Sequence, residues 1–181
     1  MAQAVTHFLF AAILVALFRD KYLKYRDRRH FPVHYLFVAG LGGVLPDLDF
    51  FALMILQFFG FTYEQVHRTF SHTLLFALIL LVIGLVLHLF DNPQFGKRHK
   101  MKWSYVFYIL AFGSVVHIIL DMIYGGGMLM LWPLSDWTIN ISLLNYIPQQ
   151  IAGVFPALVD GILLVVWIFY LEMKHKISDY I

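Results

Sequence analysis

The sequence predicts an all-α integral membrane protein, a helical bundle of about five transmembrane helices. Of its 181 residues, 61% are hydrophobic and 13% are charged, whereas soluble domains average about 45–50% apolar and about 25% charged residues. The mean hydropathy is +0.75. Five apolar stretches approach the roughly 20 residues that a helix needs to cross a bilayer. The chain therefore lacks the polar surface of a soluble domain, and lipid is the expected solvent for much of it.

The five predicted spans follow one another without a soluble domain between them, so residues 1–181 are expected to form a single membrane-embedded domain. In the first span, residues 4–18, the cations follow the apolar run, which favours a retained helix over a signal peptide. The second, residues 35–59, is expected to be broken at Pro46, because proline lacks an N–H; four spans plus a re-entrant segment around Pro46 is the alternative. The other spans are predicted over residues 73–90, 103–124 and 154–171.

Lysine and arginine indicate the orientation of the bundle. Loops 19–32 and 91–102 and the C-terminal tail carry twelve of the thirteen cations, and the thirteenth, Arg68, lies in loop 60–72. Because short cytoplasmic loops are enriched in Lys and Arg, the N-terminus is expected outside and the C-terminus in the cytoplasm. The long loop 125–153 is then extracytoplasmic, either as a flap that plugs the bundle or as a lid that guides substrate. The basic loops are too short for a nucleic-acid-reading domain, so no nucleic-acid partner is expected.

Ionisable side chains within the spans mark a candidate site, because charged groups are costly inside a bilayer. Asp47 and Asp49 lie near the middle of the second span, directly after Pro46, where a break would bring both carboxylates toward one cavity. His117 and Asp121 are four residues apart and therefore share one helix face. The purely structural alternatives are a kink in which Asp47 caps the new helix, and a His–Asp hydrogen bond between helices.

Histidines add to this cluster on the outer side of the predicted bundle. His67 and His72 flank Arg68 in loop 60–72, and His7 lies in the outer part of the first span. The inner half offers His88 as its one ionisable candidate within a span. Imidazoles and carboxylates, without cysteine or an internal lysine, suit a divalent metal ion. The predicted metal ligands are His7, Asp47, Asp49, His67, His72, His117 and Asp121.

The expected cofactor is one or two divalent ions, with zinc preferred and manganese or iron as alternatives. Such an ion activates water and polarises a carbonyl or phosphoryl oxygen, so hydrolysis is the expected chemistry. Arg68 is expected to hold a phosphate or an oxyanion; an ion pair with Glu64 or a headgroup contact is the alternative. Asp49 is the candidate general base. Asp160 of the fifth span is a further ligand candidate.

The order of these residues resembles that of the LexA-binding, inner-membrane-associated family of metal-dependent hydrolases. The resemblance covers about residues 1–135, and it implies an inner-membrane hydrolase without indicating its substrate. Ser71 takes the place of the family's usual threonine before the second histidine of its block. The motifs that carry the resemblance are Thr6-His7, the run from Gly43 to Asp49, the block from His67 to His72, His117 with Asp121, and the glycine-rich run that leads to Trp132-Pro133.

The sequence is also similar, more faintly, to zinc-dependent phospholipase C and related nucleases. Their ligands run in the order His, Asp, His and then His-x-x-x-Asp, which His7, Asp47, either His67 or His72, His117 and Asp121 reproduce here. Their downstream ligands have no evident match unless Asp160 substitutes for one. This similarity implies a lipid or lipid-linked phosphoester near the outer leaflet as the substrate.

Two other functions compete with hydrolysis. A divalent-metal or proton transporter also places Asp and His inside the membrane. Transport needs polar groups that reach both faces, however, and the inner halves of the spans offer little beyond His88 and a few hydroxyls. A non-catalytic scaffold whose helices are stapled by metal is the third hypothesis. If substitution of Arg68 abolished hydrolysis while the protein stayed folded, the scaffold hypothesis would be contradicted.

Overall fold

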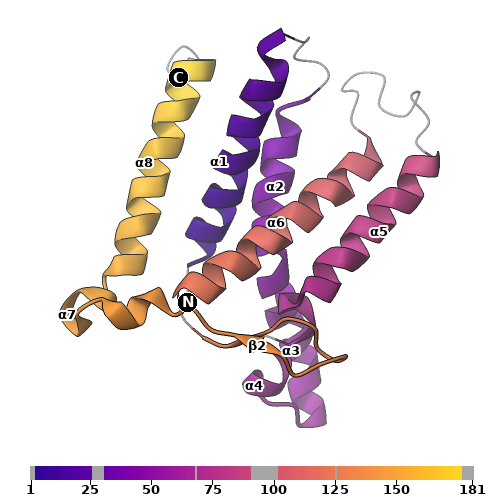
Figure 1. Ribbon diagram of the computed structural model, residues 1–181, viewed down its shortest axis with the longest axis vertical. Coiled ribbons are helices and arrows are strands. Elements are labelled where there is room, and N and C mark those ends of the chain that lie inside the picture. Colours follow the sequence, from indigo (N-terminus) through magenta and orange to yellow (C-terminus); the bar gives the residue numbers. More distant parts are fainter. Residues whose placement is uncertain (1–2, 26–30, 68, 91–101, 125, 177–181) are drawn as a thin grey trace.

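The computed structural model describes residues 3–25, 31–67, 69–90, 102–124 and 126–176, and most of them are helical (Figure 1). Three stretches are long and apolar enough to cross a membrane: His34–Phe59, Trp103–Tyr124 and Phe155–Lys174. The predicted all-α membrane fold is therefore confirmed. The principal helices are α1 (Ala4–Tyr22), α2 (His34–Val44), α5 (Leu74–Phe90), α6 (Trp103–Tyr124) and α8 (Phe155–His175).

The remaining two predicted spans are also helical, but each differs from an ideal span. Helix α5 is apolar and has 17 residues. Helix α1 has 19 residues, and it continues past the predicted end at residue 18 through Arg19, Asp20 and Lys21. Both helices pack on the long apolar ones, α5 on α6 and α1 on α2.

The second predicted span is broken at Pro46. Helix α2 ends at Val44, the 3-10 turn η3 (Leu45–Leu48) follows, and α3 (Asp49–Leu56) and η4 (Gln57–Phe59) continue the chain. Proline cannot donate the backbone hydrogen bond of an α-helix, and a tighter 3-10 turn takes over at this point. The predicted break is confirmed, and it places Asp47 and Asp49 where the helix changes type.

Helices α1, α2 and α6 form the centre of the bundle, with α5 beside α6 and α8 beside α1 (Figure 1). Glycines let α2 and α6 touch backbone to backbone. A Cβ atom on Gly42 would lie 2.8 Å from the carbonyl oxygen of Leu110, and one on Gly113 would lie 2.6 Å from the carbonyl carbon of Gly42. Small residues at helix contacts are typical of membrane bundles, so these glycines bring α2 and α6 close enough for their polar side chains to meet.

The two ends of the bundle differ in charge. One end, the basic end, holds the six Lys and Arg residues that the structure describes, at the ends of α1 and α8 and just before α6 (Figure 1). They are Arg19, Lys21, Lys24, Lys102, Lys174 and Lys176. This separation agrees with the predicted sorting of the cations, while the absolute orientation in the membrane stays a prediction.

The other end, the hairpin end, is built from short elements, so the loop predicted over residues 125–153 is partly ordered into turns and strands. Strands β1 and β2 pair antiparallel, with Met128 opposite Ile139. The short elements at this end are α4 (Tyr63–Val66), η5 (Phe70–His72), β1 (Met128–Leu129), β2 (Thr138–Ile139), η6 (Leu143–Tyr146) and α7 (Gln149–Ala152).

Candidate metal centre

The structure brings all seven predicted ligands together at the hairpin end, although they come from four separate parts of the chain. Each imidazole has a carboxylate oxygen within 3.1–3.9 Å of a ring nitrogen. Asp47 has the most exposed of the seven side chains, at 28%, and the other six are exposed by 10% or less. The cluster is therefore a buried group of imidazoles and carboxylates with one partly accessible member.

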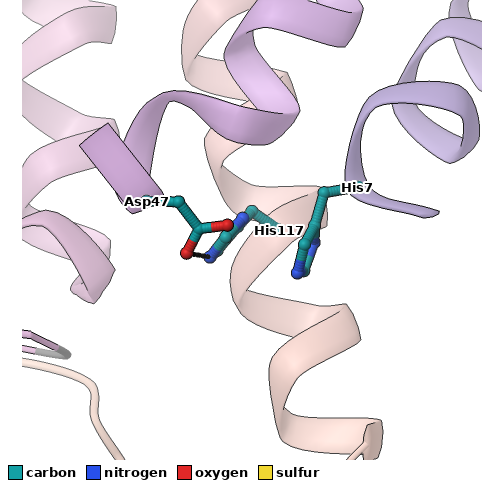
Figure 2. A group of neighbouring side chains, drawn as sticks. All are labelled: His7, Asp47 and His117. Carbon is teal, nitrogen blue, oxygen red and sulfur yellow. Dashed lines mark ion pairs between the residues drawn. The ribbon is translucent and has the colours of Figure 1, made fainter. Parts of the chain in front are cut away.

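Asp47 lies at the centre of this cluster. Its Oδ1 atom is 3.4 Å from Nε2 of His72 and 3.6 Å from Nε2 of His117. Figure 2 shows the carboxylate facing His117, with His7 on the far side of that ring; the two imidazoles stack with centroids 3.9 Å apart. Asp47 belongs to two groups whose potential ligand atoms all lie within 4.8 Å of one another, one with His7 and His117 and one with His67 and His72.

His117 and Asp121 form the wall of the cluster on α6. Oδ1 of Asp121 lies 3.3 Å from Nε2 of His7, and its Oδ2 lies 3.9 Å from Nε2 of His117. The second distance exceeds that of a hydrogen bond, so a direct His117–Asp121 hydrogen bond does not account for the pair. His72, His117 and Asp121 make up the third group of close ligand atoms.

The backbone of α2 fixes the orientation of the His117 ring. Nδ1 of His117 lies 2.7 Å from the carbonyl oxygen of Gly43, and because a carbonyl only accepts, Nδ1 is the donor. In the neutral ring, Nε2 then carries a lone pair directed at the carboxylates of Asp47 and Asp121. A backbone carbonyl on the far nitrogen is a common way to orient a metal-binding histidine.

Gly43 is required for this arrangement, since a Cβ atom there would lie 2.3 Å from the carbonyl oxygen of His7. We expect Gly43→Ala to push α1 from α2 and to lower the melting temperature, measured by circular dichroism in detergent. Gly161→Ala on α8 is the matched control, because nothing lies within 4 Å of a Cβ there and alanine is the better helix former by about 1 kcal/mol. Similar losses in the two variants would contradict this role of Gly43.

Asp49 occupies a different position from Asp47. Its two oxygens each lie 3.1 Å from Nδ1 of His67. Oδ2 accepts a hydrogen bond from the Ser71 hydroxyl at 3.2 Å and is 3.4 Å from Nδ1 of His72. Among the described residues, Asp49 belongs to none of the three groups of close ligand atoms. A carboxylate on the Nδ1 side orients an imidazole so that its Nε2 atom is presented to a metal.

Several polar atoms of the cluster fit a bound cation. Four imidazole nitrogens are buried and have no hydrogen-bond partner among the described residues; they are Nδ1 of His7 and Nε2 of His67, His72 and His117. Leaving such an atom unsatisfied costs about 1–3 kcal/mol. The described Lys and Arg residues all lie at the basic end, so none of them balances the carboxylates here. Imidazole nitrogens and carboxylate oxygens together suit zinc, manganese or iron.

The carboxylates around His72 also favour a positive charge at this place. Burial lowers the pKa of its imidazole, but the adjacent carboxylates of Asp47 and Asp49 outweigh that effect and raise the pKa above its ordinary value. A positive charge at His72 is thus favoured, whether a proton or a metal ion supplies it.

Other residues considered in the sequence lie beside or away from this centre. Arg68 lies outside the described residues. His88 is on α5, where its ring lies near those of Tyr105 and Tyr108, distant in sequence from every ligand. Asp160 on α8 is buried and accepts a hydrogen bond from the Thr6 hydroxyl. The sequence pattern does not predict a role for Thr6, whose one signal is its position directly before His7.

A comparison with protein families gives a match over nearly the whole chain. The family model described as YdjM inner membrane protein covers residues 1–176. The chain belongs to the YdjM inner membrane protein family. Membership and the apolar helices place the protein in the inner membrane, as the resemblance implied, and the match extends beyond residue 135 to α8. Comparisons with curated proteins and with solved structures find no match.

Proposed function

We propose that this member of the YdjM family is a metal-dependent hydrolase that acts on a lipid or lipid-linked ester or phosphoester. The observation that carries the proposal is one buried cluster in which the carboxylates of Asp47 and Asp121 lie among four imidazoles, each with a ring nitrogen that has no hydrogen bond to the described residues. Residues that would hold one or two divalent ions, zinc by preference, are Asp47, His72, His117 and Asp121, with His7 and His67 beside them.

A divalent ion bound there would lower the pKa of a water molecule and polarise the scissile ester group. The side chains around it hold the ligands in place. The contacts of Asp49 with His67, His72 and Ser71 favour a positioning role for this carboxylate over the general-base role expected from the sequence. Arg68, next to His67 in the chain, would bind the phosphate oxygens or the developing oxyanion, because a guanidinium pairs with such groups bidentately.

A lipid substrate is supported by the surface of α3, which begins at Asp49. No residue of this helix is buried. Phe50, Phe51 and Ile55 are exposed by 56–64%, and an apolar surface of this kind on a membrane protein contacts lipid. The partly exposed carboxylate of Asp47 lies two residues before the start of α3, so an ester group at the lipid boundary is the substrate that fits best.

The proposal is tested with purified full-length protein in detergent, loaded with zinc, manganese or iron. We expect metal-dependent hydrolysis of bis(p-nitrophenyl) phosphate or of phospholipid in mixed micelles. The Asp47→Asn variant should lose both the bound metal and this activity. Arg68→Ala is expected to keep the metal and the fold but to lose most of the activity. Stoichiometric metal without hydrolysis of any phosphoester or carboxylic ester would contradict a hydrolase and favour transport or a scaffold.

Thr6 and Asp160 are expected to support His7, because their hydrogen bond ties the start of α1 to α8. Thr6→Val should lower zinc affinity by about 10-fold, the effect of losing a residue that orients a ligand, and Thr6→Ser should restore it. Competition with a chromogenic chelator measures the affinity. Lys174→Gln is the control, since it breaks the 3.4 Å pair with Asp20, which joins the same two helices at the basic end. Equal losses in Thr6→Val and Lys174→Gln would show that general loosening of α8 is responsible.

A further inference from the structure

A groove between α1 and α6 lies in the half of the bundle away from the metal centre. It consists of two cavities of about 260 and 290 Å³ that share the lining residues Phe18, Phe31, Tyr108 and Ile109. The groove exists because α1 and α6 meet at the hairpin end, where His7 stacks on His117, and separate toward the basic end (Figure 1). We call it the α1–α6 groove.

The lining of the α1–α6 groove changes in polarity along the bundle. The cavity nearer the basic end is also lined by Tyr22 and Tyr105, which carry hydroxyl groups. The second cavity is also lined by Leu14, Val15 and Phe112. Leu14 lies eight residues before Tyr22 on the same helix, which is about 12 Å deeper in the bundle at 1.5 Å per residue. The groove is thus polar where it opens at the basic end and apolar toward the middle of the membrane.

One cation, Lys102, lies beside the polar mouth, and two more lie near the end of α1. The ammonium of Lys102 lies 5.2 Å from the centre of the Tyr105 ring, and the backbone N–H of Lys102 donates a 2.8 Å hydrogen bond to the Tyr35 hydroxyl. Lys21 and Lys24 follow at the end of α1. Basic pockets between transmembrane helices are suited to anionic lipid headgroups.

We propose that the α1–α6 groove binds an anionic phospholipid, with an acyl chain along Leu14, Ile109 and Phe112 and the phosphate at Lys102. The gradient from apolar to hydroxyl-bearing to cationic residues matches the order of parts in such a lipid. This site lies at the opposite end of the bundle from the metal centre and does not depend on the proposed hydrolysis. It would hold a structural or regulatory lipid at the basic surface.

Native mass spectrometry of the full-length protein in micelles with equal amounts of phosphatidylglycerol and phosphatidylcholine tests the proposal. We expect one retained lipid per chain, with phosphatidylglycerol preferred. Lys102→Gln should reduce that preference by about fivefold, the effect expected for one lysine near an anionic headgroup. Lys176→Gln, which removes the same charge beside α8 at the same end, is the control and should leave the preference unchanged.

A second pair of variants tests where the acyl chain binds. Leu14→Trp fills the apolar part of the α1–α6 groove and should abolish retention of the lipid, at a melting temperature close to that of the wild type. Leu164→Trp, at an exposed position of α8, adds the same bulk outside the groove and should leave retention of the lipid unchanged. Equal retention of the two lipids by the wild type, or equal behaviour within either pair of variants, would overturn the proposal.

Discussion

Asp47→Asn is expected to lower zinc affinity by more than about 100-fold, a loss that substitution of His72 or His117, each also in two of the three groups of close ligand atoms, should match. Even residues that only orient a ligand contribute about 10–100-fold to metal affinity, and Asp47 belongs to two of the three groups of close ligand atoms. Asparagine has almost the same shape but lacks the negative charge, so the substitution separates charge from packing. Titration of the purified variant against a chromogenic chelator measures the change.

The matched control is Asp20→Asn at the basic end of α1. The two carboxylates are similarly accessible, with side chains exposed by 25% for Asp20 and 28% for Asp47. Asp20 pairs with Arg19 and Lys174 instead of histidines, so its loss should leave zinc affinity unchanged. A zinc affinity of Asp47→Asn equal to that of the wild type would contradict the role of Asp47 as a central ligand of the site.

Removal of the metal is expected to lower the melting temperature of the wild-type protein by about 8–16 °C. A ligand present at 1,000 times its dissociation constant stabilises a protein by about 4 kcal/mol, and each kcal/mol corresponds to about 2–4 °C in a chain of this size. Without a cation, the carboxylates of Asp47, Asp49 and Asp121 repel one another within one buried cluster. Thermal unfolding with zinc and with EDTA, followed by tryptophan fluorescence, measures the shift.

The double variant His72→Ala/His117→Ala shows whether EDTA acts through this cluster. It removes two of the four imidazole nitrogens that have no hydrogen bond to the described residues, so EDTA should leave its melting temperature unchanged. An EDTA shift of the same size in the wild type and the double variant would mean that zinc stabilises the protein elsewhere. No shift in the wild type would argue against a structural contribution of the metal.

The fold was predictable because its signals are local. Hydropathy located the helices, and the missing N–H of Pro46 located the break between α2 and α3. The end of α1 was not predictable in the same way. The apolar run stops at residue 18, but the helix continues to Tyr22, because Arg19 reaches the carbonyl oxygen of Phe31 at 2.8 Å and Asp20 pairs with Lys174 on α8. Those contacts depend on residues distant in the sequence.

The membership of the candidate site was also predictable, whereas the roles of its residues were not. Ionisable residues within apolar segments are few, so the seven ligand candidates stand out in the sequence. Nothing local indicates that Asp49 contacts the Nδ1 atoms of His67 and His72, or that the Gly43 carbonyl orients His117. The contacts of Asp49 arise where η3 and α3 pack on η5 and α4, and the contact of Gly43 arises from the packing of α2 on α6. The sequence pattern specifies neither arrangement.

The central claim, that this chain holds a divalent metal through histidine and aspartate, is tested most directly by the metal content of detergent-purified protein. The metal content is measured by inductively coupled plasma mass spectrometry in the wild type and in the Asp121→Asn and His72→Ala variants. Circular dichroism spectra that match the wild type show that both variants are folded. We predict stoichiometric zinc, manganese or iron in the wild type and a clear loss in both variants. A wild type that contains no metal, even after incubation with each of the three ions, would contradict the claim.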